Sequence, residues 1–167
     1  PAIRAKIIAG TTTKHSGVSK APYSGFNLAT HVNDCPERVA ANRAIFREYF
    51  QFPKEPYWLN QTHSTQALHI PYQYQPTIAA DASFTSHSQK VCTVMTADCL
   101  PLLLVDNSGQ FIAAIHAGWR GLLHGIIQQT IDDICYASRL EGQHLNQQQV
   151  KTKSSLMPPA FVCMFPE

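Results

Sequence analysis

Length, composition and charge place this chain among ordinary globular proteins. It has 167 residues, of which 44% are hydrophobic and 14% charged, and its formal net charge is +2. A core can be buried in one domain at this length, and the small charge, with no basic cluster interleaved with aromatic residues, argues against a nucleic-acid partner.

The chain shows no membrane or export signal in its sequence. No apolar run has the length of a membrane-spanning helix, and residues 1–10 lack the apolar core of a signal peptide. We therefore expect a cytoplasmic protein with no membrane partner. The five cysteines are odd in number and form no C-x-x-C pair, so neither a disulfide framework nor a zinc ribbon is indicated.

The N-terminal third predicts a strand, a long loop and a helix. A short strand is expected over Ile3–Ala9, and turn-forming residues then fill 11–25. Long loops often carry function, so Lys14 and His15 are candidate anion ligands, with a plain solvated loop as the alternative. Asp34 is placed to cap a helix that begins near Pro36.

That helix carries residues at helical spacing that we interpret as its buried face, namely Val39, Asn42, Phe46, Tyr49 and Phe50. Asn42 and Arg43 are polar for such a position and could point toward a site. Residues 57–70 are typical of a strand, a polar turn and a second strand, and His63 lies where the apolar pattern stops. Asp81 is acidic among small apolar residues, so it either caps a turn or serves a buried site.

An antiparallel hairpin is the central expected element. Two β-prone runs flank the turn formers at 106–109. Counting outward from the middle of that turn pairs Cys99 with His116, close enough for one metal ion to bridge them. A buried inert thiol and an ordinary strand-end histidine are the alternative, and a bulge at Gly109 would shift the pairing.

An amphipathic helix is predicted over Trp119–Ala137, and its N-terminus near His116 could hold an anion with help from Arg120. Beyond Arg139 the periodicity ends, so we expect residues 140–167 to form an irregular tail. Together these elements predict an α/β (α+β) single domain, a sandwich-like mixed sheet with flanking helices and a central hairpin at 99–116.

Three side chains suggest a metal site with an open position for water. His63, Cys99 and His116 would supply two imidazoles and a thiolate, a donor set found at catalytic zinc. Cys99 could instead act as a nucleophile paired with His116, although His63 would then have no role. The chain has no His-x-His pair, which counts against a cluster of several coppers.

Successive motifs resemble those of the bacterial laccase-domain family, also described as polyphenol oxidases or purine nucleoside phosphorylases. The motifs are Asn27-Leu28-Ala29-Thr30-His31-Val32-Asn33-Asp34, Asn42-Arg43, Trp58-Leu59-Asn60-Gln61-Thr62-His63, Ala80-Asp81-Ala82, Thr96-Ala97-Asp98-Cys99-Leu100-Pro101 and His116-Ala117-Gly118-Trp119-Arg120-Gly121. They occur in order over roughly residues 7–138. The resemblance implies a family domain over 1–139, incomplete because 140–167 matches nothing in the family.

The resemblance also implies a function. Family members are associated with zinc, or with copper in the polyphenol-oxidase description, and the motif ligands fall on His63, Cys99 and His116. The implied activity is phosphorolysis of purine nucleosides (adenosine, inosine, methylthioadenosine) together with deamination of adenosine. These three side chains and Asp98 are then the expected catalytic residues, and the expected substrate-binding residues are Lys14, Asn27, Arg43, Asp81 and Arg120.

Two other functions stay open from the sequence. Copper-dependent oxidation of phenols is one, and a truncated, non-catalytic module is the other. Either enzyme would act on small molecules, purine nucleoside and phosphate or phenols, and the unmatched tail leaves room for an oligomer.

Overall fold

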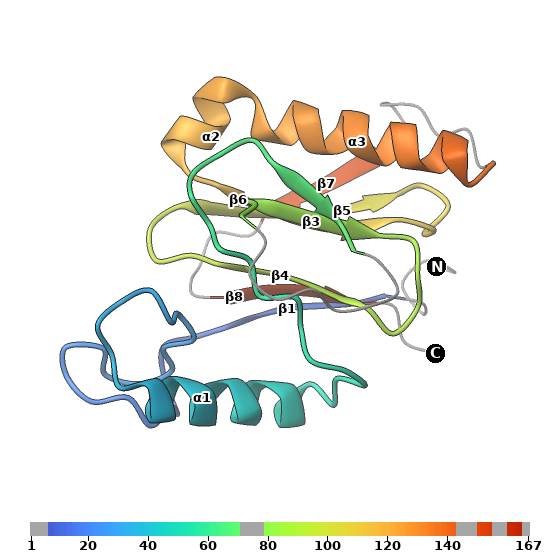
Figure 1. Ribbon diagram of the computed structural model, residues 1–167. Helices are drawn as coiled ribbons and strands as arrows, with labels where there is room; N and C mark the ends of the chain where they lie inside the picture. The colour runs from blue at the N-terminus through green and yellow to red at the C-terminus, as the bar shows by residue number, and fades with distance from the viewer. Residues whose placement is uncertain (1–6, 71–78, 143–149, 155–159, 165–167) are drawn as a thin grey trace.

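The chain folds as two β-sheets between two layers of helix (Figure 1). The computed structural model describes residues 7–70, 79–142, 150–154 and 160–164. The elements in chain order are β1 (Ile8–Thr12), α1 (Pro36–Tyr49), β2 (Ala67–His69), β3 (Ala82–Thr85), β4 (Val91–Met95), β5 (Leu100–Asp106), β6 (Ile112–Ala117), α2 (Trp119–His124), α3 (Ile126–Leu140), β7 (Val150–Ser154) and β8 (Ala160–Met164). The mixed α/β class and the sandwich are as predicted.

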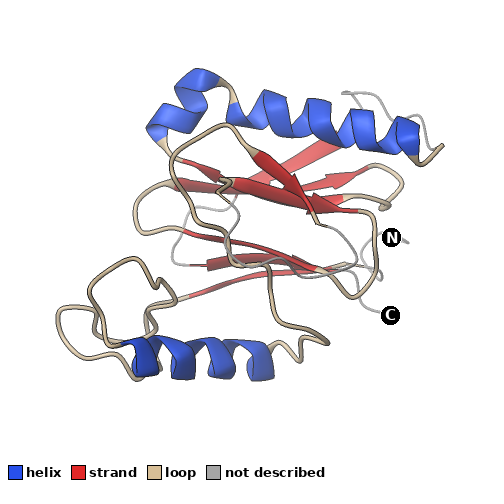
Figure 2. Cartoon of the chain, viewed as in Figure 1, coloured by secondary structure: helices blue, strands red, loops and turns tan. Residues whose placement is uncertain are grey.

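The two sheets have different strand orders. One contains β1-β8-β4, and the other contains β2-β3-β6-β5-β7. Among the described strands, β2 and β3 pair in parallel and the other strand pairs are antiparallel. Helices α2 and α3 cover the outer face of the five-stranded sheet, and α1 covers the three-stranded sheet on the opposite side (Figure 2).

Apolar side chains fill each of the three interfaces between these layers. Ile126 and Ile134 of α3 pack on the five-stranded sheet, Val94 and Ile112 meet between the sheets, and Phe46 of α1 packs beneath β4. Tyr49, on the expected buried stripe of α1, is 79% exposed. Among the described residues, no helix is long and apolar enough to cross a membrane.

The central hairpin forms as predicted, but the predicted register is wrong. Pro101, not Cys99, lies opposite His116, so the strands are displaced by two residues. The cause is a wider loop: Asp106 N donates to Phe111 O, and the Asp106 carboxylate accepts from the backbone N–H groups of Ser108, Gln110 and Phe111. An Asp side chain that binds the loop backbone in this way stabilises a longer turn than the two-residue one assumed from the pattern.

The helix predicted over Trp119–Ala137 is two helices. Gly125 has φ 86° and ends α2, and α3 starts directly afterwards. A residue in the left-handed conformation breaks the helical hydrogen-bond pattern, and glycine adopts it without steric cost. Apolar residues continue across the break in the sequence, which is why periodicity alone did not reveal it, but Leu122 and Leu123 of α2 are exposed.

Two expectations near the N-terminus also need correction. The N-cap of α1 is Cys35, not Asp34. The Asp34 carboxylate instead accepts hydrogen bonds from Ser19 Oγ at 2.6 Å and Asn27 Nδ2 at 2.9 Å, so it ties loop segments together. The strand expected over Ile3–Ala9 is found at Ile8–Thr12, and residues 3–6 lie outside the described residues.

The tail expected to be irregular contains two strands. β7 extends the five-stranded sheet beside β5, and β8 lies between β1 and β4. A strand in the middle of a sheet is stabilised by backbone hydrogen bonds on both sides, which leave no periodic signature in a short sequence window. Residues 143–149, 155–159 and 165–167 of that tail are outside the described residues.

Candidate metal centre and substrate cavity

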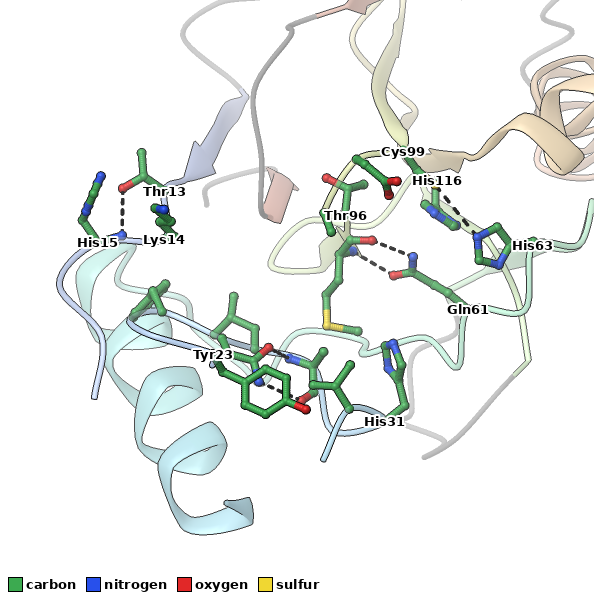
Figure 3. A pocket seen from close by; sticks show the side chains of 18 residues that line it. Thr13, Lys14, His15, Tyr23, His31, Gln61, His63, Thr96, Cys99 and His116 are labelled. Atoms are coloured by element: carbon green, nitrogen blue, oxygen red, sulfur yellow. Dashed lines mark hydrogen bonds between the residues drawn. The ribbon is translucent and has the colours of Figure 1, made fainter. Parts of the chain in front are cut away.

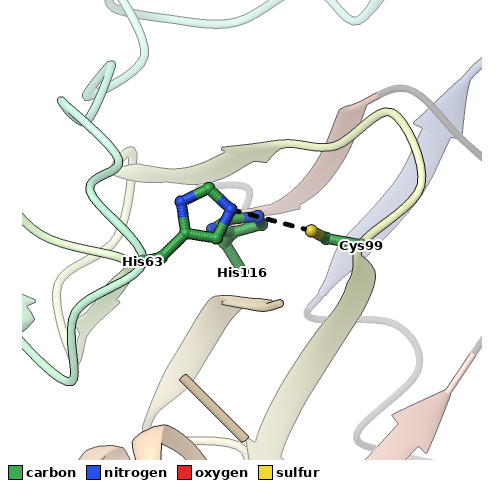
Figure 4. A group of neighbouring side chains, drawn as sticks. All are labelled: His63, Cys99 and His116. Atoms are coloured by element: carbon green, nitrogen blue, oxygen red, sulfur yellow. Dashed lines mark hydrogen bonds between the residues drawn. The ribbon is translucent and has the colours of Figure 1, made fainter. Parts of the chain in front are cut away.

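Three donor side chains from distant parts of the sequence converge at one end of the five-stranded sheet. The ligand atoms of His63, Cys99 and His116 all lie within 4.8 Å of one another. Figure 4 shows these three side chains gathered at one place. Cys99 Sγ is 3.9 Å from His63 Nε2, and the two imidazole rings are 4.9 Å apart at 74°. His63 and Cys99 keep access to solvent, whereas His116 is only 4% exposed.

Each donor reaches this point from a different kind of segment. His116 belongs to β6, Cys99 directly precedes β5, and His63 comes from the loop before β2. Continuing the observed register by one residue beyond the Leu100–Ala117 pair places Cys99 opposite Gly118. A Cβ atom at Gly118 would lie 2.9 Å from His63 Cδ2 and 3.0 Å from Cys99 Sγ, so the absence of a side chain there allows both donors to close over the strand end.

Asp81 is completely buried and positions two of the donors. Its carboxylate accepts hydrogen bonds from His116 Nδ1 at 2.8 Å and from the backbone N–H groups of Thr62, His63 and Ser64 at 3.1, 3.0 and 2.7 Å. Ser64 Oγ donates a further bond of 2.7 Å. Burial by itself raises the pKa of Asp81, but the hydrogen bonds from His116, Ser64 and Thr62 outweigh it and lower that pKa well below the usual range.

Because Asp81 is ionised, it can only accept hydrogen bonds, so His116 must carry its proton on Nδ1. The Nε2 lone pair of His116 is then free for a metal ion. A carboxylate behind a ligating histidine is the usual arrangement that fixes ring orientation at such sites.

The same carboxylate holds His63 in an unusual backbone conformation. His63 has φ 60°, in the left-handed region that residues other than glycine seldom adopt. Three successive N–H groups that bind one carboxylate compensate the strain of about 1–3 kcal/mol expected for such a residue. Strained backbone of this kind is concentrated at functional sites.

Gln61 joins the His63 loop to the segment that carries Cys99. Its Nε2 donates to Met95 O at 2.7 Å, and its Oε1 accepts from Met95 N at 2.8 Å. This pair of bonds replaces a backbone bridge between the loop and the end of β4. Sequence reasoning missed Gln61, because nothing in the local pattern distinguishes an amide that spans two segments from an ordinary surface one.

A cavity of about 780 Å³ opens in front of the three donors. Apolar side chains such as Phe26, Leu28 and Met95 form part of its wall. Polar side chains, among them Lys14 and Gln61, also line it (Figure 3). A cleft of this volume is in the range that binds small-molecule substrates and cofactors.

The cavity contains part of the residue set expected from the sequence. Lys14, Asn27 and Asp98 line it together with the three donors, and so do His15 and His31. Asp98 is exposed. His31 was singled out only as part of a motif, and the structure places it among the residues that line the cavity (Figure 3).

Three expected substrate-binding residues do not appear among the described residues that line the cavity. Arg43 Nε donates to Leu28 O at 2.9 Å, and its guanidinium lies 4.0 Å from the centre of the Trp58 ring. Arg120 is exposed and its guanidinium lies 4.6 Å from the Trp119 ring centre. Asp81 lies behind the donors, with no exposed surface.

Asn42 and Arg43 hold one wall of the cavity in place. The buried Asn42 amide donates to Asn27 O at 2.8 Å and to Gly25 O at 3.2 Å, and its Oδ1 accepts from Val18 N at 2.9 Å. These bonds attach the long N-terminal loop to α1. The polar positions on the buried face of that helix therefore support the wall of the cavity instead of pointing into it.

The protonation of Cys99 bears on the alternative of a free nucleophile. Burial raises the pKa of the Cys99 thiol, and the carboxylates of Asp98 and Asp81 raise it further. A thiol in such surroundings is a poor nucleophile at neutral pH unless a cation stabilises its thiolate. Two imidazoles and a sulfur donor, with a buried carboxylate behind one of them, fit a zinc or copper ion by donor chemistry.

Comparison with known proteins agrees with these features. The sequence profile described as multi-copper polyphenol oxidoreductase laccase matches residues 8–147. The chain is 49% identical over 125 residues to a Haemophilus influenzae protein named purine nucleoside phosphorylase, covering 75% of this chain and 51% of that protein. It is 38% identical over 136 residues to the purine nucleoside phosphorylase YfiH of Escherichia coli, covering 81% and 55%.

Solved structures show the same fold. A Neisseria meningitidis protein superposes with a TM-score of 0.74 at 35% identity, over 90% of this chain and 58% of that one. YlmD of Geobacillus stearothermophilus gives 0.77 at 23% identity, over 93% and 59%. The chain spans about half the length of the curated relatives it matches. It belongs to the family described as multi-copper polyphenol oxidoreductase laccase, whose curated members among these relatives are named purine nucleoside phosphorylases.

Proposed function

We propose that this chain carries the reaction site of a zinc-dependent purine nucleoside phosphorylase that also deaminates adenosine. The observation that carries the proposal is the convergence of His63, Cys99 and His116 at a cavity of about 780 Å³. The names of the curated relatives support the substrate class. The proposed substrates are adenosine, inosine and methylthioadenosine, with phosphate as the second reactant.

Each of the residues at the site has its own role in this proposal. His63, Cys99 and His116 hold the metal ion, which supplies Lewis-acid chemistry when bound. Asp81 keeps His116 in the tautomer that can bind it. Lys14, at the cavity wall, would neutralise the incoming phosphate, and Asn27 would contact the nucleoside.

In phosphorolysis, a phosphate oxygen forms a bond to ribose C1′ while the bond from C1′ to the purine nitrogen breaks. The departing base needs a proton or a positive charge nearby, and Asp98 is the acidic side chain that lines the cavity beside Cys99. In deamination, water replaces the amino group of adenosine, which leaves as ammonia. In this proposal Asp98 would carry a proton from the attacking water to the departing amino group.

A direct assay tests the proposal. The zinc-loaded chain is incubated with inosine, with and without phosphate, and hypoxanthine is measured by chromatography. Inosine formed from adenosine is measured in the same way. We expect phosphate-dependent hypoxanthine from the wild type, none from Cys99→Ala, and unchanged release from Cys135→Ala, which alters a buried cysteine on α3.

Copper-dependent phenol oxidation is the second candidate, favoured by the description of the matching family. The three donors form the single metal-binding group found within residues 7–70 and 79–142, whereas oxidation through several coppers needs more ligands. Oxygen uptake with a phenol by the copper-loaded chain, without nucleoside turnover, would favour this candidate. Inactivity with both metals would show that the chain is a non-catalytic module.

A further inference from the structure

A buried hydroxyl group beside the metal centre has no hydrogen-bond partner among the described residues. Thr96 lines the cavity in front of the three donors, and 8% of the residue is exposed. Its Oγ1 atom is enclosed and unpartnered, as are the hydroxyl oxygens of Thr12 and Ser83, but neither of those two residues lines this cavity. A hydroxyl that is buried without a partner destabilises the folded state. Folding therefore does not account for the hydroxyl of Thr96 at this place.

The polar groups next to Thr96 are engaged elsewhere. Both backbone groups of Met95 bond to the Gln61 amide, at 2.8 Å through N and at 2.7 Å through O. Within β4, the buried hydroxyl of Thr93 donates to Tyr57 O at 3.0 Å. The two threonines thus differ, because folding uses the hydroxyl of Thr93 and leaves the hydroxyl of Thr96 available.

A rotation about a single bond can turn the Thr96 hydroxyl toward the cavity. The substituents of a threonine Cβ occupy staggered positions, so a turn of about 120° about the Cα–Cβ bond exchanges Oγ1 with Cγ2. The enclosed position of Oγ1 offers no polar partner, and it therefore suits a methyl group better than a hydroxyl. A ligand that provides a hydrogen bond from the cavity favours the rotated side chain.

Thr96 lies between the groups that the proposed reaction uses. In Figure 3 it stands between Lys14 on one side and the three metal donors on the other. Deamination requires the purine ring near the donors, and the phosphate held by Lys14 must reach ribose C1′. The ribose joins the attacked carbon to the purine, so it passes Thr96. A ribose hydroxyl both donates and accepts hydrogen bonds, as a threonine hydroxyl does.

We propose that Thr96 is a specificity-determining residue whose hydroxyl binds a ribose hydroxyl of the nucleoside. The inference rests on the proposed function, because it uses the position of the nucleoside in the cavity. A ribonucleoside gives the buried hydroxyl the partner that the fold does not provide. A deoxy analogue leaves it unpartnered, so the site discriminates between the two.

The test compares kcat/KM for phosphorolysis of inosine, 2′-deoxyinosine and 3′-deoxyinosine by the zinc-loaded chain. Thr96→Val keeps the shape of the side chain and removes the hydroxyl, whereas Thr96→Ser retains the hydroxyl. We expect the preference of the wild type for inosine over one of the two analogues to fall about tenfold in Thr96→Val and to persist in Thr96→Ser. Because the same substrates are compared in every variant, the intrinsic reactivity of each glycosidic bond cancels.

Thermal unfolding separates this role from a structural one. Thr96→Val should unfold at the wild-type temperature or above it, because it removes an unpartnered hydroxyl. The matched control Thr93→Val loses the bond to Tyr57 O, so it should unfold at a lower temperature and keep the wild-type preference for inosine.

Three results would overturn the role of Thr96 while the proposed function stands. They are unchanged discrimination in Thr96→Val, an equal loss of discrimination in Thr93→Val, and a lower unfolding temperature of Thr96→Val. If the wild type released no hypoxanthine in the presence of phosphate, the proposed function would fail and this inference would fail with it.

Discussion

Replacing Asp81 with asparagine removes one charge from the buried side chain that positions both histidine donors. The wild-type carboxylate uses Oδ1 to accept from His63 N and His116 Nδ1, and Oδ2 to accept from Thr62 N and from Ser64. Asparagine keeps one acceptor oxygen, and its NH₂ group must face the donors on the other side. If the oxygen replaces Oδ2, the NH₂ group confronts His63 N–H and His116 Nδ1.

The cost follows from these contacts. An orphaned buried N–H at His63 costs about 1–3 kcal/mol, and the bonds that remain lose the extra strength they had to a charged acceptor. We therefore expect the free energy of unfolding to fall by about 3 kcal/mol. His116 can satisfy the new donor only by moving its proton to Nε2, which blocks the metal-binding nitrogen, so zinc affinity should fall at least about tenfold to a hundredfold.

Urea unfolding and zinc titration by calorimetry measure the two effects. Asp98→Asn is the matched control, because Asp98 is an exposed carboxylate in the same neighbourhood; its unfolding free energy should stay within about 0.5 kcal/mol of the wild type. If Asp81→Asn were as stable as the wild type and bound zinc with unchanged affinity, the assignment of Asp81 as the residue that orients the donors would be refuted.

Two further substitutions, each with a control, and an acid titration test how the three donors are held in place. Gly118→Ala places a methyl group within 3.0 Å of two donors, so zinc affinity measured by competition with a chelator should fall more than about tenfold. Gly121→Ala, whose new Cβ would meet Ile126 Cγ2 at 3.2 Å, should lower stability and leave zinc binding intact. Gln61→Ala removes both bonds to Met95 and should cost about 1–2 kcal/mol in thermal unfolding, together with weaker zinc binding, whereas the exposed Gln66→Ala should do neither. The pKa of Asp81 is lowered on folding, so its contribution to stability is complete above about pH 4 and is lost as the pH falls further. Acid titration of urea midpoints should show this loss in the wild type and a smaller one in Asp81→Asn; an identical acid dependence would contradict it.

Local sequence was sufficient for the elements whose pattern reflects burial on one side. The sequence predicted the apolar stripe of α3 and the two arms of the central hairpin, because the period of apolar residues matches the period of the backbone. It also predicted the helix start at Pro36, from the proline in the first turn. The break at Gly125 and the wide loop after Asp106 were not predicted. Both depend on a backbone conformation or a side chain to backbone bond that leaves the apolar pattern unchanged.

The candidate donors were named from the residue types and motifs, but the strand register predicted to bring them together differs from the observed one. The predicted pairing of Cys99 with His116 was off by two residues. Gly118 leaves the space in which the side chains of Cys99 and His63 come together. His63 comes from a loop far away in sequence. Its position depends on the hydrogen bond that Asp81 accepts from His63 N and on the bonds between Gln61 and Met95, none of which a local pattern encodes.

By itself, then, the sequence determined the class of fold, the hairpin and the chemistry of the donors, since these follow from side-chain type and short-range periodicity. Tertiary structure alone decided the strand register, the insertion of β8 between β1 and β4, and the convergence of three donors on one point. The physical reason is that backbone hydrogen bonds between distant segments are alike for nearly all residues. Which segments pair is therefore settled by the packing of the whole chain.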